Sequence, residues 1–437
     1  MAKLNKPRTP LRTHEGAVAK HITPEQQLKR SVMSCMLWEN EFYEDGISIS
    51  KRIAELVPQV DPIKVAFIAE NARSAMKLRH VPLLVAREMA RHKSHSKWVA
   101  GILEYIIQRP DELTEYLAIY WKTNNGKKTI SAQSKKGLAK AFQKFDEYSL
   151  AKYNRDDAIK LRDVLFLCHA EPKDTEQAAL WARLVNNELT IPDTWEVALS
   201  SGADKKSTWE RLLVERKLGA LALLRNLRNM TSVGVSNELI KESLNSMKTE
   251  RVLPFRFITA ARYAPFLEPL LEVAMFRCLE GKEKLKGKTI LLVDVSGSMD
   301  QPISAKSEMT RMDGACGLAV LARELCDEVN IYTFSNNCVP VPTRRGFALR
   351  DAIINSQLHS CTYLGKALES IAHLDADRLI IFTDEQSHDR LRDPLCKGYV
   401  INVASYQNGV GYGAWNHVDG FSEAVFDFII ELERENV

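Results

Sequence analysis

The sequence lacks any apolar run of the roughly 18–20 residues that a helix needs to cross a bilayer. Its first residues, MAKLNKPRTPLRTHEG, have no apolar centre and so do not have the pattern of a secretory signal. The eight cysteines are scattered without a Cys-x-x-Cys pair, which is typical of reduced thiols rather than of a disulfide framework. These absences predict a cytoplasmic protein with no membrane partner.

Patterns typical of catalysis are also missing. The sequence has no glycine-rich loop that would cradle a phosphate, no nucleophile paired with a base and no carboxylate cluster for two metal ions. His92 and His95 have a spacing found in zinc sites, but no cysteine or carboxylate cluster accompanies them. We therefore expect a protein that is not an enzyme.

Charge is unevenly distributed along the chain. The net charge of the 437 residues is only +4. Residues 1–286 hold 47 Lys and Arg against 35 Asp and Glu, a balance of +12, whereas residues 287–437 hold 13 against 21, a balance of −8. This asymmetry indicates a polyanionic partner for the first part and argues against nucleic acid binding by the second.

The hydrophobic pattern divides the chain into three parts. Residues 1–23 are basic and have no periodicity, so we expect a flexible or loosely docked arm. Residues 24–286 carry apolar side chains at helical spacing with short breaks, which predicts an all-α module of HEAT-like repeats, although a compact bundle fits the same pattern. Residues 287–437 alternate between strand and helix, which predicts a doubly wound α/β domain. We expect its strands at 289–294, 329–334, 339–343, 378–383 and 399–405.

The most informative stretch is residues 289–300, TILLVDVSGSMD. A run of apolar and β-branched residues predicts a buried strand, and Asp294, Ser296 and Ser298 follow at alternate positions. Alternate side chains of an extended chain point the same way, so these three oxygen-bearing groups can converge on one point. Carboxylate and hydroxyl oxygens suit a hard divalent cation, Mg²⁺ or alternatively Mn²⁺.

Two further oxygen ligands follow along the chain. Thr362 lies in a polar loop before a helical pattern, and Asp384 ends a second buried strand. Ligands of an open α/β sheet gather outside the carboxyl ends of neighbouring strands, so we expect both side chains near Asp294. A plain turn after the first strand, with Asp384 capping a helix, is the simpler alternative. The whole pattern resembles the metal-ion-dependent adhesion site of von Willebrand factor A domains.

A basic helix is predicted within the densest cationic run, residues 127–144. Its lysines recur every four residues on one face, where like charges repel unless a polyanion offsets them. We expect nucleic acid contact by these lysines and the basic residues after them: Lys136, Lys140, Lys144, Lys152, Arg155 and Arg162. A solvated helix face is the alternative. His169 follows an apolar helix, and a lone histidine in that place is usually packed and hydrogen-bonded.

Several segments resemble the TROVE module of the Ro autoantigen family. They are LWE at 37–39 with FYEDG at 42–46, LRDVL at 161–165 leading to His169, and ALLRNL at 222–227. A von Willebrand A domain after the TROVE module completes that architecture, so the resemblance covers about residues 17–433. The short arm and the lack of eukaryotic targeting features fit a bacterial or phage member.

The resemblance implies a fold and a set of RNA partners. In this family a ring of helical repeats is closed by the A domain, and small structured noncoding RNAs, the Y RNAs, bind the basic outer surface. Single-stranded ends of misfolded RNAs enter a central hole, and bacterial members are linked to RNA decay by exoribonucleases. By residue match, Lys152, Arg162 and His169 fall in the segment tied to RNA contact.

We therefore expect the RNA-binding scaffold of a ribonucleoprotein that serves RNA quality control. Its metal site would capture an acidic group of an exoribonuclease or of another protein. The alternative is a metal-dependent phosphoryl-transfer or nuclease enzyme that uses Asp294 and Asp384. A purely protein-binding adhesion module would leave the basic half of the chain unexplained.

Overall fold

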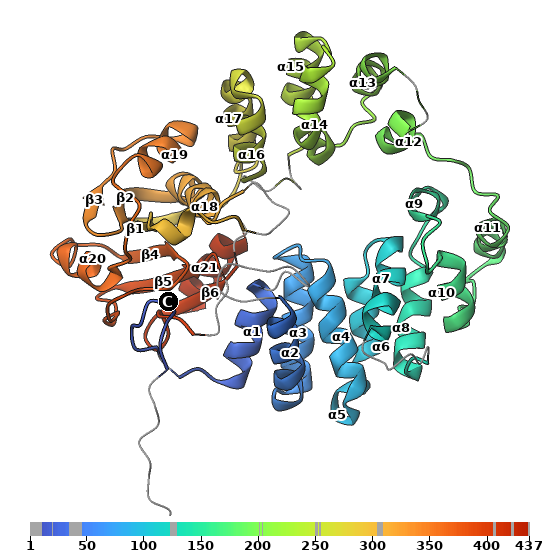
Figure 1. The fold of residues 1–437 in the computed structure, drawn as a ribbon, viewed down its shortest axis with the longest axis horizontal. Helices are drawn as coiled ribbons and strands as arrows, with labels where there is room; N and C mark the ends of the chain where they lie inside the picture. The colour runs from blue at the N-terminus through green and yellow to red at the C-terminus, as the bar shows by residue number, and fades with distance from the viewer. Residues whose placement is uncertain are drawn as a thin grey trace, which may run out of the picture. The chain divides into compact units, whose positions relative to one another are not determined.

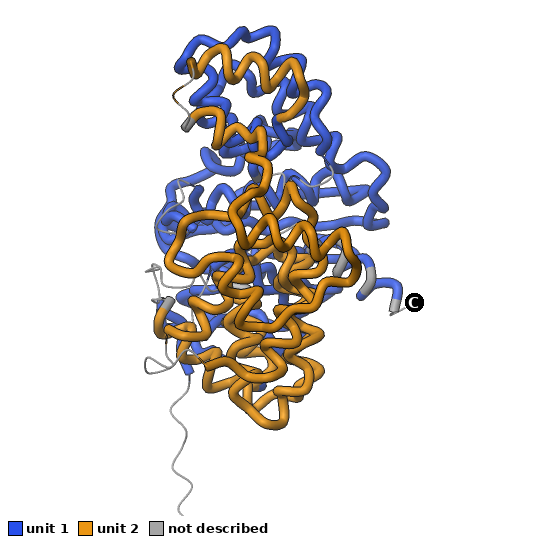
Figure 2. Tube along the Cα trace, turned by 90° about the vertical axis from the view of Figure 1, so that its right-hand side faces the viewer, with its two compact units in different colours: residues 1–23, 39–45, 218–437 blue, residues 24–38, 46–217 orange. Residues whose placement is uncertain are grey.

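The chain forms two compact units in a computed structural model (Figure 1). Unit 1 comprises residues 1–23, 39–45 and 218–437, and unit 2 comprises residues 24–38 and 46–217 (Figure 2). The structure describes residues 11–435 except 20, 35–45, 123–128, 201, 203, 250, 251, 253, 254, 304–308, 405–407 and 421–423. The motifs at 37–39 and 42–45, and residues 1–10 of the expected arm, lie outside the described residues.

Unit 2 contains helices and no strand in the part of the chain that is described. They are α1 (Pro24–Ser34), α2 (Gly46–Leu56), η1 (Val57–Gln59), α3 (Pro62–Ser74), α4 (His80–Arg91), α5 (Lys93–Ser96), α6 (Val99–Ile106), α7 (Pro110–Trp121), α8 (Ala132–Phe142), α9 (Glu147–Tyr153), α10 (Leu161–Cys168), α11 (Thr175–Val185), α12 (Trp195–Ser200) and α13 (Lys205–Val214). Several begin with a proline, whose fixed φ suits the first helical position. Others begin after a capping side chain, as α11 does after Asp174, which accepts a hydrogen bond from the Gln177 N–H at 2.7 Å.

Helices α6 and α8 approach each other closely within unit 2. The contact is at Gly137 of α8, where a Cβ atom would lie 2.8 Å from the Leu103 Cβ and 3.0 Å from the backbone of Ala100. Around this contact, Leu103 and Phe142 are fully buried. Because Gly137 has no side chain, the backbone of α8 can lie directly against Ala100 and Leu103 of α6.

Unit 1 contains a six-stranded sheet and the remaining helices. The strands are β1 (Leu285–Asp294), β2 (Cys326–Phe334), β3 (Cys338–Pro340), β4 (Arg378–Thr383), β5 (Lys397–Asn402) and β6 (Asn416–Asp419). The helices are α14 (Ala220–Ser232), α15 (Asn237–Ser246), α16 (Phe255–Tyr263), η2 (Pro265–Leu267), α17 (Glu268–Arg277), η3 (Gly297–Asp300), α18 (Arg311–Leu325), α19 (Gly346–Ile354), α20 (Leu364–Ser370) and α21 (Ala424–Glu435). The strand order is β3-β2-β1-β4-β5-β6, and every pair is parallel except β2 and β3.

The predicted fold class is confirmed: a helical module precedes a doubly wound, mostly parallel α/β sheet. Strand β6 was not predicted, because its sequence, NHVD, offers a single large apolar residue and no alternation to detect. Helices α14–α17, which the sequence places with the helical module, belong by their contacts to the same unit as the sheet. None of the described helices is both long and apolar enough to span a membrane.

Replacing Gly137 by alanine tests the close packing of α6 and α8. Alanine favours a helix interior by about 1 kcal/mol over glycine. At this position the new methyl group must push two helices apart, and overpacking typically costs about 1–3 kcal/mol. We therefore expect Gly137→Ala to lower the free energy of unfolding in a urea titration.

Gly101 of α6 provides the matched control. Nothing lies within 4 Å of a Cβ built at that position. Gly101→Ala should therefore show only the gain in helix propensity and stabilise the protein. Equal stabilisation by both substitutions would contradict the close approach of the helices.

Candidate functional site

Asp294 and Asp384 lie at the carboxyl ends of β1 and β4, the two neighbouring strands at the centre of the sheet. The chain runs from β1 outward to β2 and β3, then returns to β4 on the other side of β1. Such a reversal in strand order opens the crevice in which α/β sheets bind their ligands. The two carboxylates stand at the carboxyl ends of β1 and β4 and are 0% and 1% exposed.

Asp294 is fixed from two sides. Its Oδ1 accepts a hydrogen bond from the Ser296 backbone N–H at 2.9 Å, and its Oδ2 accepts one from the Thr383 hydroxyl at 2.7 Å. Burial, and then the charge of Asp384, raise the pKa of Asp294 to about 7. The surroundings of Asp294 therefore compensate its negative charge poorly. A cation bound at this strand end would be stabilised by that charge.

The two predicted serine ligands join the carboxylates. The Ser298 hydroxyl donates a hydrogen bond to Asp384 Oδ2 at 2.6 Å, and the Ser296 and Ser298 hydroxyl oxygens lie 3.3 Å apart. The alternation predicted from the sequence thus places both serines on the side of the carboxylates. Together with Asp294 they form a compact group of oxygens from β1, η3 and the end of β4.

The loop that carries Thr362 also reaches this edge. The Gly297 N–H donates to the Ser360 carbonyl at 2.9 Å, so the loop lies against the serine segment. Thr362 is buried, and its carbonyl accepts a hydrogen bond from the Ser387 hydroxyl at 3.3 Å. The structure thus brings this loop to the edge where the sequence predicted it.

A basic residue that the sequence did not indicate lies beside the acids. Arg311, the first residue of α18, is buried, and its Nη1 lies 3.4 Å from Asp384 Oδ2 and 3.5 Å from the Ser298 carbonyl. The guanidinium balances part of the charge of Asp384 and leaves Asp294 as the less balanced acid. No spacing rule connects position 311 to position 384, so only the fold reveals this pair.

A buried ion triad lies directly after Asp384. His417 Nδ1 is 2.9 Å from Glu385 Oε1, its Nε2 is 2.9 Å from Asp419 Oδ1, and its ring stacks on Tyr412 at 4.0 Å. Burial lowers the pKa of His417, but the two carboxylates outweigh it and raise the pKa to about 9. The Glu385 backbone is in a left-handed conformation with φ of 63°. These three side chains could also hold a metal ion if His417 lost its proton.

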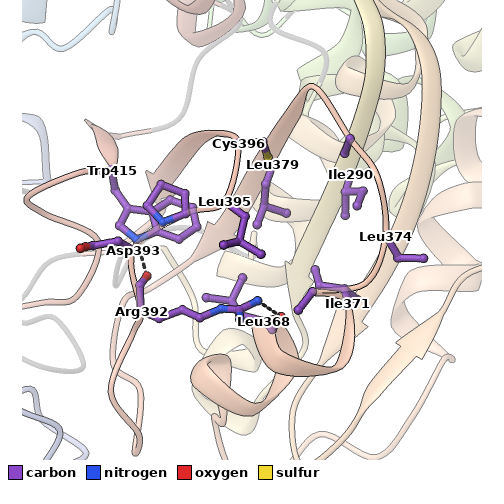
Figure 3. Close-up of a pocket in the computed structure, with 13 residues that line it drawn as sticks. Ile290, Leu368, Ile371, Leu374, Leu379, Arg392, Asp393, Leu395, Cys396 and Trp415 are labelled. Carbon is purple, nitrogen blue, oxygen red and sulfur yellow. Dashed lines mark hydrogen bonds between the residues drawn. The ribbon is translucent and has the colours of Figure 1, made fainter.

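A small apolar pocket lies elsewhere in unit 1 (Figure 3). Its volume is about 40 Å³, and it is lined by residues that include Ile290, Leu379 and Trp415. Ile290 and Leu379 pair with each other in β1 and β4, four residues before Asp294 and five residues before Asp384. The pocket is therefore separate from the acidic group and is large enough for little more than a water molecule.

Two of the three lysines predicted to share one face of α8 contact α6 instead of facing solvent alone. Lys140 forms an ion pair with Glu104 at 2.8 Å. Lys144 donates hydrogen bonds to the carbonyl oxygens of Glu104 and Ile107 at the end of α6, and burial lowers its pKa. Lys136 is exposed. Contact of these lysines with RNA stays a prediction, and Lys140 and Lys144 also hold α6 to α8.

Lys152 and Arg155 line a cavity of about 500 Å³ in unit 2, together with polar groups such as Asn187 and Thr190. Arg162 does not line it and lies 4.0 Å from Asp163. His169 ends α10 in a left-handed conformation with φ of 51° and is exposed, unlike the packed histidine that its sequence position suggested. The structure thus gathers two of the predicted RNA-contact residues in one hollow.

Comparison with known proteins identifies one family and one fold. Residues 181–272 match the family described as TROVE domain. The crystal structure of the RO (RSR) protein of Deinococcus radiodurans superimposes with a TM-score of 0.62 over 95% of this chain and 100% of that chain, at 17% identity. That likeness shows the fold.

Two curated relatives match a shorter stretch. The proteins named telomerase protein component 1 of Mus musculus and Rattus norvegicus are 40% and 39% identical over 79 residues, which are 17% of this chain. The chain spans only about 3% of the length of these curated relatives.

The ion triad predicts a pH dependence of stability. The folded pKa of His417 is about 9, above its ordinary value of 6.5. The stability that it contributes is therefore fully present below about pH 6.5 and is lost as the pH rises through 9. We expect the free energy of unfolding to fall across this range by on the order of 2 kcal/mol more in the wild type than in His417→Gln. Equal slopes in urea titrations of the two proteins would contradict a charged His417.

Proposed function

We propose that this chain is a member of the Ro autoantigen family and the RNA-binding protein of a ribonucleoprotein. The family resemblance seen in the sequence is confirmed by the match at residues 181–272 and by the shared architecture. The proposed RNA partners are small structured Y-like RNAs and the single-stranded ends of misfolded RNAs. Quality control or decay of RNA in the cytoplasm is the proposed role, with an exoribonuclease as a candidate protein partner.

A cluster of cations around Tyr153 supports RNA binding. The guanidinium carbons of Arg109 and Arg155 lie 4.6 and 6.0 Å from the ring centroid, and Lys152 Nζ lies 5.9 Å from it. Arg109 is also held by Asp111 at 2.6 Å. Lys152 and Arg155 instead line the open cavity of unit 2. This is the observation on which the RNA proposal depends.

The aromatic ring has a physical role in this cluster. Contact with its face restrains long cationic side chains, so less conformational entropy is lost when a phosphate binds them. Tyr153 does not itself line the cavity, so its role is to restrain the cations that do. Positively charged grooves are typical of surfaces that track single-stranded nucleic acid. The neutral polar side chains in the cavity can donate further hydrogen bonds to phosphate or sugar.

The acidic group at the sheet edge fits a divalent cation, with Mg²⁺ preferred and Mn²⁺ as the alternative. Asp294, Ser296 and Ser298 would supply ligands from one segment, and Thr362 and Asp384 would complete the set. The raised pKa of Asp294 supports this assignment, because a cation would balance its charge. Such an ion would bind an acidic group of a protein partner, and binding rather than catalysis is the proposed role.

Removing both cavity cations tests the RNA proposal. Lys152→Ala with Arg155→Ala should weaken binding of a structured RNA with a single-stranded end. The slope of log affinity against log salt should become shallower by about 0.7 for each single-strand phosphate that the variant no longer neutralises. Filter binding at several salt concentrations measures both quantities.

Lys64→Ala with Lys206→Ala removes two other surface charges of unit 2. Lys64 pairs with Glu25 at 2.6 Å and Lys206 with Glu210 at 4.0 Å, so each already has an acidic partner. This control should leave the salt slope close to that of the wild type. If both double variants show the same drop in affinity and slope, binding depends on overall charge and the cavity has no special role.

The metal proposal is tested with Asp294→Asn, which keeps the shape of the side chain and removes its charge. We expect this variant to lose Mg²⁺ and Mn²⁺ binding in titration calorimetry while it retains RNA affinity. Asp351→Asn changes an exposed acid of the same unit and should bind metal as the wild type does. Unchanged metal affinity in Asp294→Asn would show that the ligand set is wrong.

The same variant separates binding from catalysis. A nuclease that uses Asp294 and Asp384 would cleave RNA only with Mg²⁺ present, and Asp294→Asn would abolish that cleavage. The proposed scaffold leaves the RNA intact under the same conditions.

A further inference from the structure

The N-terminal segment of the chain docks on the loop that follows Asp384. Residues 12–18 form a short hairpin, closed by a bridge between Arg12 and Val18 and by the Thr13 N–H, which donates to the Ala17 carbonyl at 2.9 Å. Of the two forms expected for the arm, residues 12–18 adopt the docked one. Hydrogen bonds that sequence periodicity does not reveal hold the hairpin in place.

Two hydrogen bonds attach the hairpin to buried residues. The Thr13 hydroxyl donates to the Ser387 carbonyl at 3.0 Å, and the His14 N–H donates to Gln386 Oε1 at 2.7 Å. Gln386 in turn holds the strand end, because its backbone N–H donates to Asp384 Oδ1 at 3.2 Å. The hairpin is therefore connected through Gln386 to Asp384, a proposed metal ligand.

A second connection runs through a histidine. Glu15 Oε2 lies 3.1 Å from His388 Nε2, and His388 Nδ1 lies 3.2 Å from the backbone nitrogen of Thr362. The His388 backbone N–H also donates to the Thr362 carbonyl at 2.9 Å. Both backbone groups of Thr362, a second proposed ligand, are thus held by His388, whose ring contacts the half-buried carboxylate of Glu15 in the hairpin.

Both ring nitrogens have partners. Nε2 faces the Glu15 carboxylate, and Nδ1 lies 3.2 Å from both the backbone nitrogen and the carbonyl oxygen of Thr362. With its proton on Nε2, the ring can accept a hydrogen bond from the Thr362 N–H at Nδ1. Residues that orient a metal ligand in this way typically contribute about 10–100-fold to metal affinity. Here the ligand so oriented is Thr362, held by His388, and Glu15 acts on it through the His388 ring.

We propose that Glu15 and His388 are positioning residues of the metal site, through which the N-terminal hairpin holds the loop of Thr362 at the sheet edge. The proposal rests on the metal site put forward above. It assigns to residues 12–18 a role in metal affinity, because an unrestrained loop loses conformational entropy when its threonine becomes a ligand.

Three single variants of the full-length chain test this role with Mg²⁺ and Mn²⁺ in titration calorimetry. Glu15→Ala removes the acceptor for Nε2 and should weaken metal binding by about tenfold. Glu15→Gln keeps an oxygen acceptor, so it should bind metal nearly as tightly as the wild type. His388→Phe keeps a ring beside Tyr363, whose centroid lies 5.3 Å away, but loses both nitrogens and should resemble Glu15→Ala.

Glu283→Ala is the matched control, since Glu283 is an exposed acid of the same unit that pairs with Arg434. It should leave metal affinity unchanged. Melting temperatures measured in EDTA should be similar for the wild type, the Glu15 variants and the control, because Glu15 acts on the loop and not on the core.

The outcomes separate the two proposals. If the wild type binds neither cation, the metal site itself is wrong. If the wild type binds and Asp294→Asn does not, but Glu15→Ala binds as the wild type does, the positioning role is overturned. Equally weakened binding in Glu15→Ala, Glu15→Gln and Glu283→Ala would reduce the effect to general surface charge and would also overturn it.

Discussion

The burial of two carboxylates at the ends of adjacent strands is the constraint on which this end of unit 1 depends. Ionised carboxylates buried without partners are strongly unfavourable, and two of them repel each other. Around Asp294 and Asp384 the chain supplies donors from separate elements: the Thr383 and Ser298 hydroxyls and the guanidinium of Arg311. These groups lessen the cost without removing it, since the pKa of Asp294 remains raised.

The same requirement explains the crowded polar loop after β4. Glu385, Gln386 and Ser387 are almost completely buried, and buried polar groups need hydrogen-bond partners. Partners come from far along the chain, since the His417 ring of β6 forms an ion pair with Glu385 and the Thr13 hydroxyl of the N-terminal hairpin donates a hydrogen bond to the Ser387 carbonyl. A site that needs several oxygens in one place thus recruits distant segments to support it, and their contacts restrain the loops that carry the ligands.

The spacing of the acidic and hydroxyl residues at the sheet edge, and their order along the chain, could be predicted from the sequence. The residues that contact and restrain them could not. Asp294, Ser296 and Ser298 follow from the period of an extended chain, and the position of Asp384 follows from the topology of a parallel sheet. Arg311 and His417 could not be predicted, because each is an ordinary residue that acquires a partner only through tertiary contact. Strand β6, which carries His417, is itself too short to leave a pattern.

In the basic half of the chain, the net charge differs from the charge that a bound phosphate could reach. Spacing correctly placed the lysines of α8 on one face, but it could not show that this face meets α6, where Lys140 and Lys144 find internal partners. Counterion release rewards only cations that a phosphate can reach and that are not already neutralised. By that criterion we propose Lys152 and Arg155, which line an open cavity, as RNA contacts ahead of the longer lysine run. The +12 balance of residues 1–286 therefore indicates the class of partner. The place where that partner binds depends on which cationic side chains stay accessible in the folded chain and are not already paired with acids.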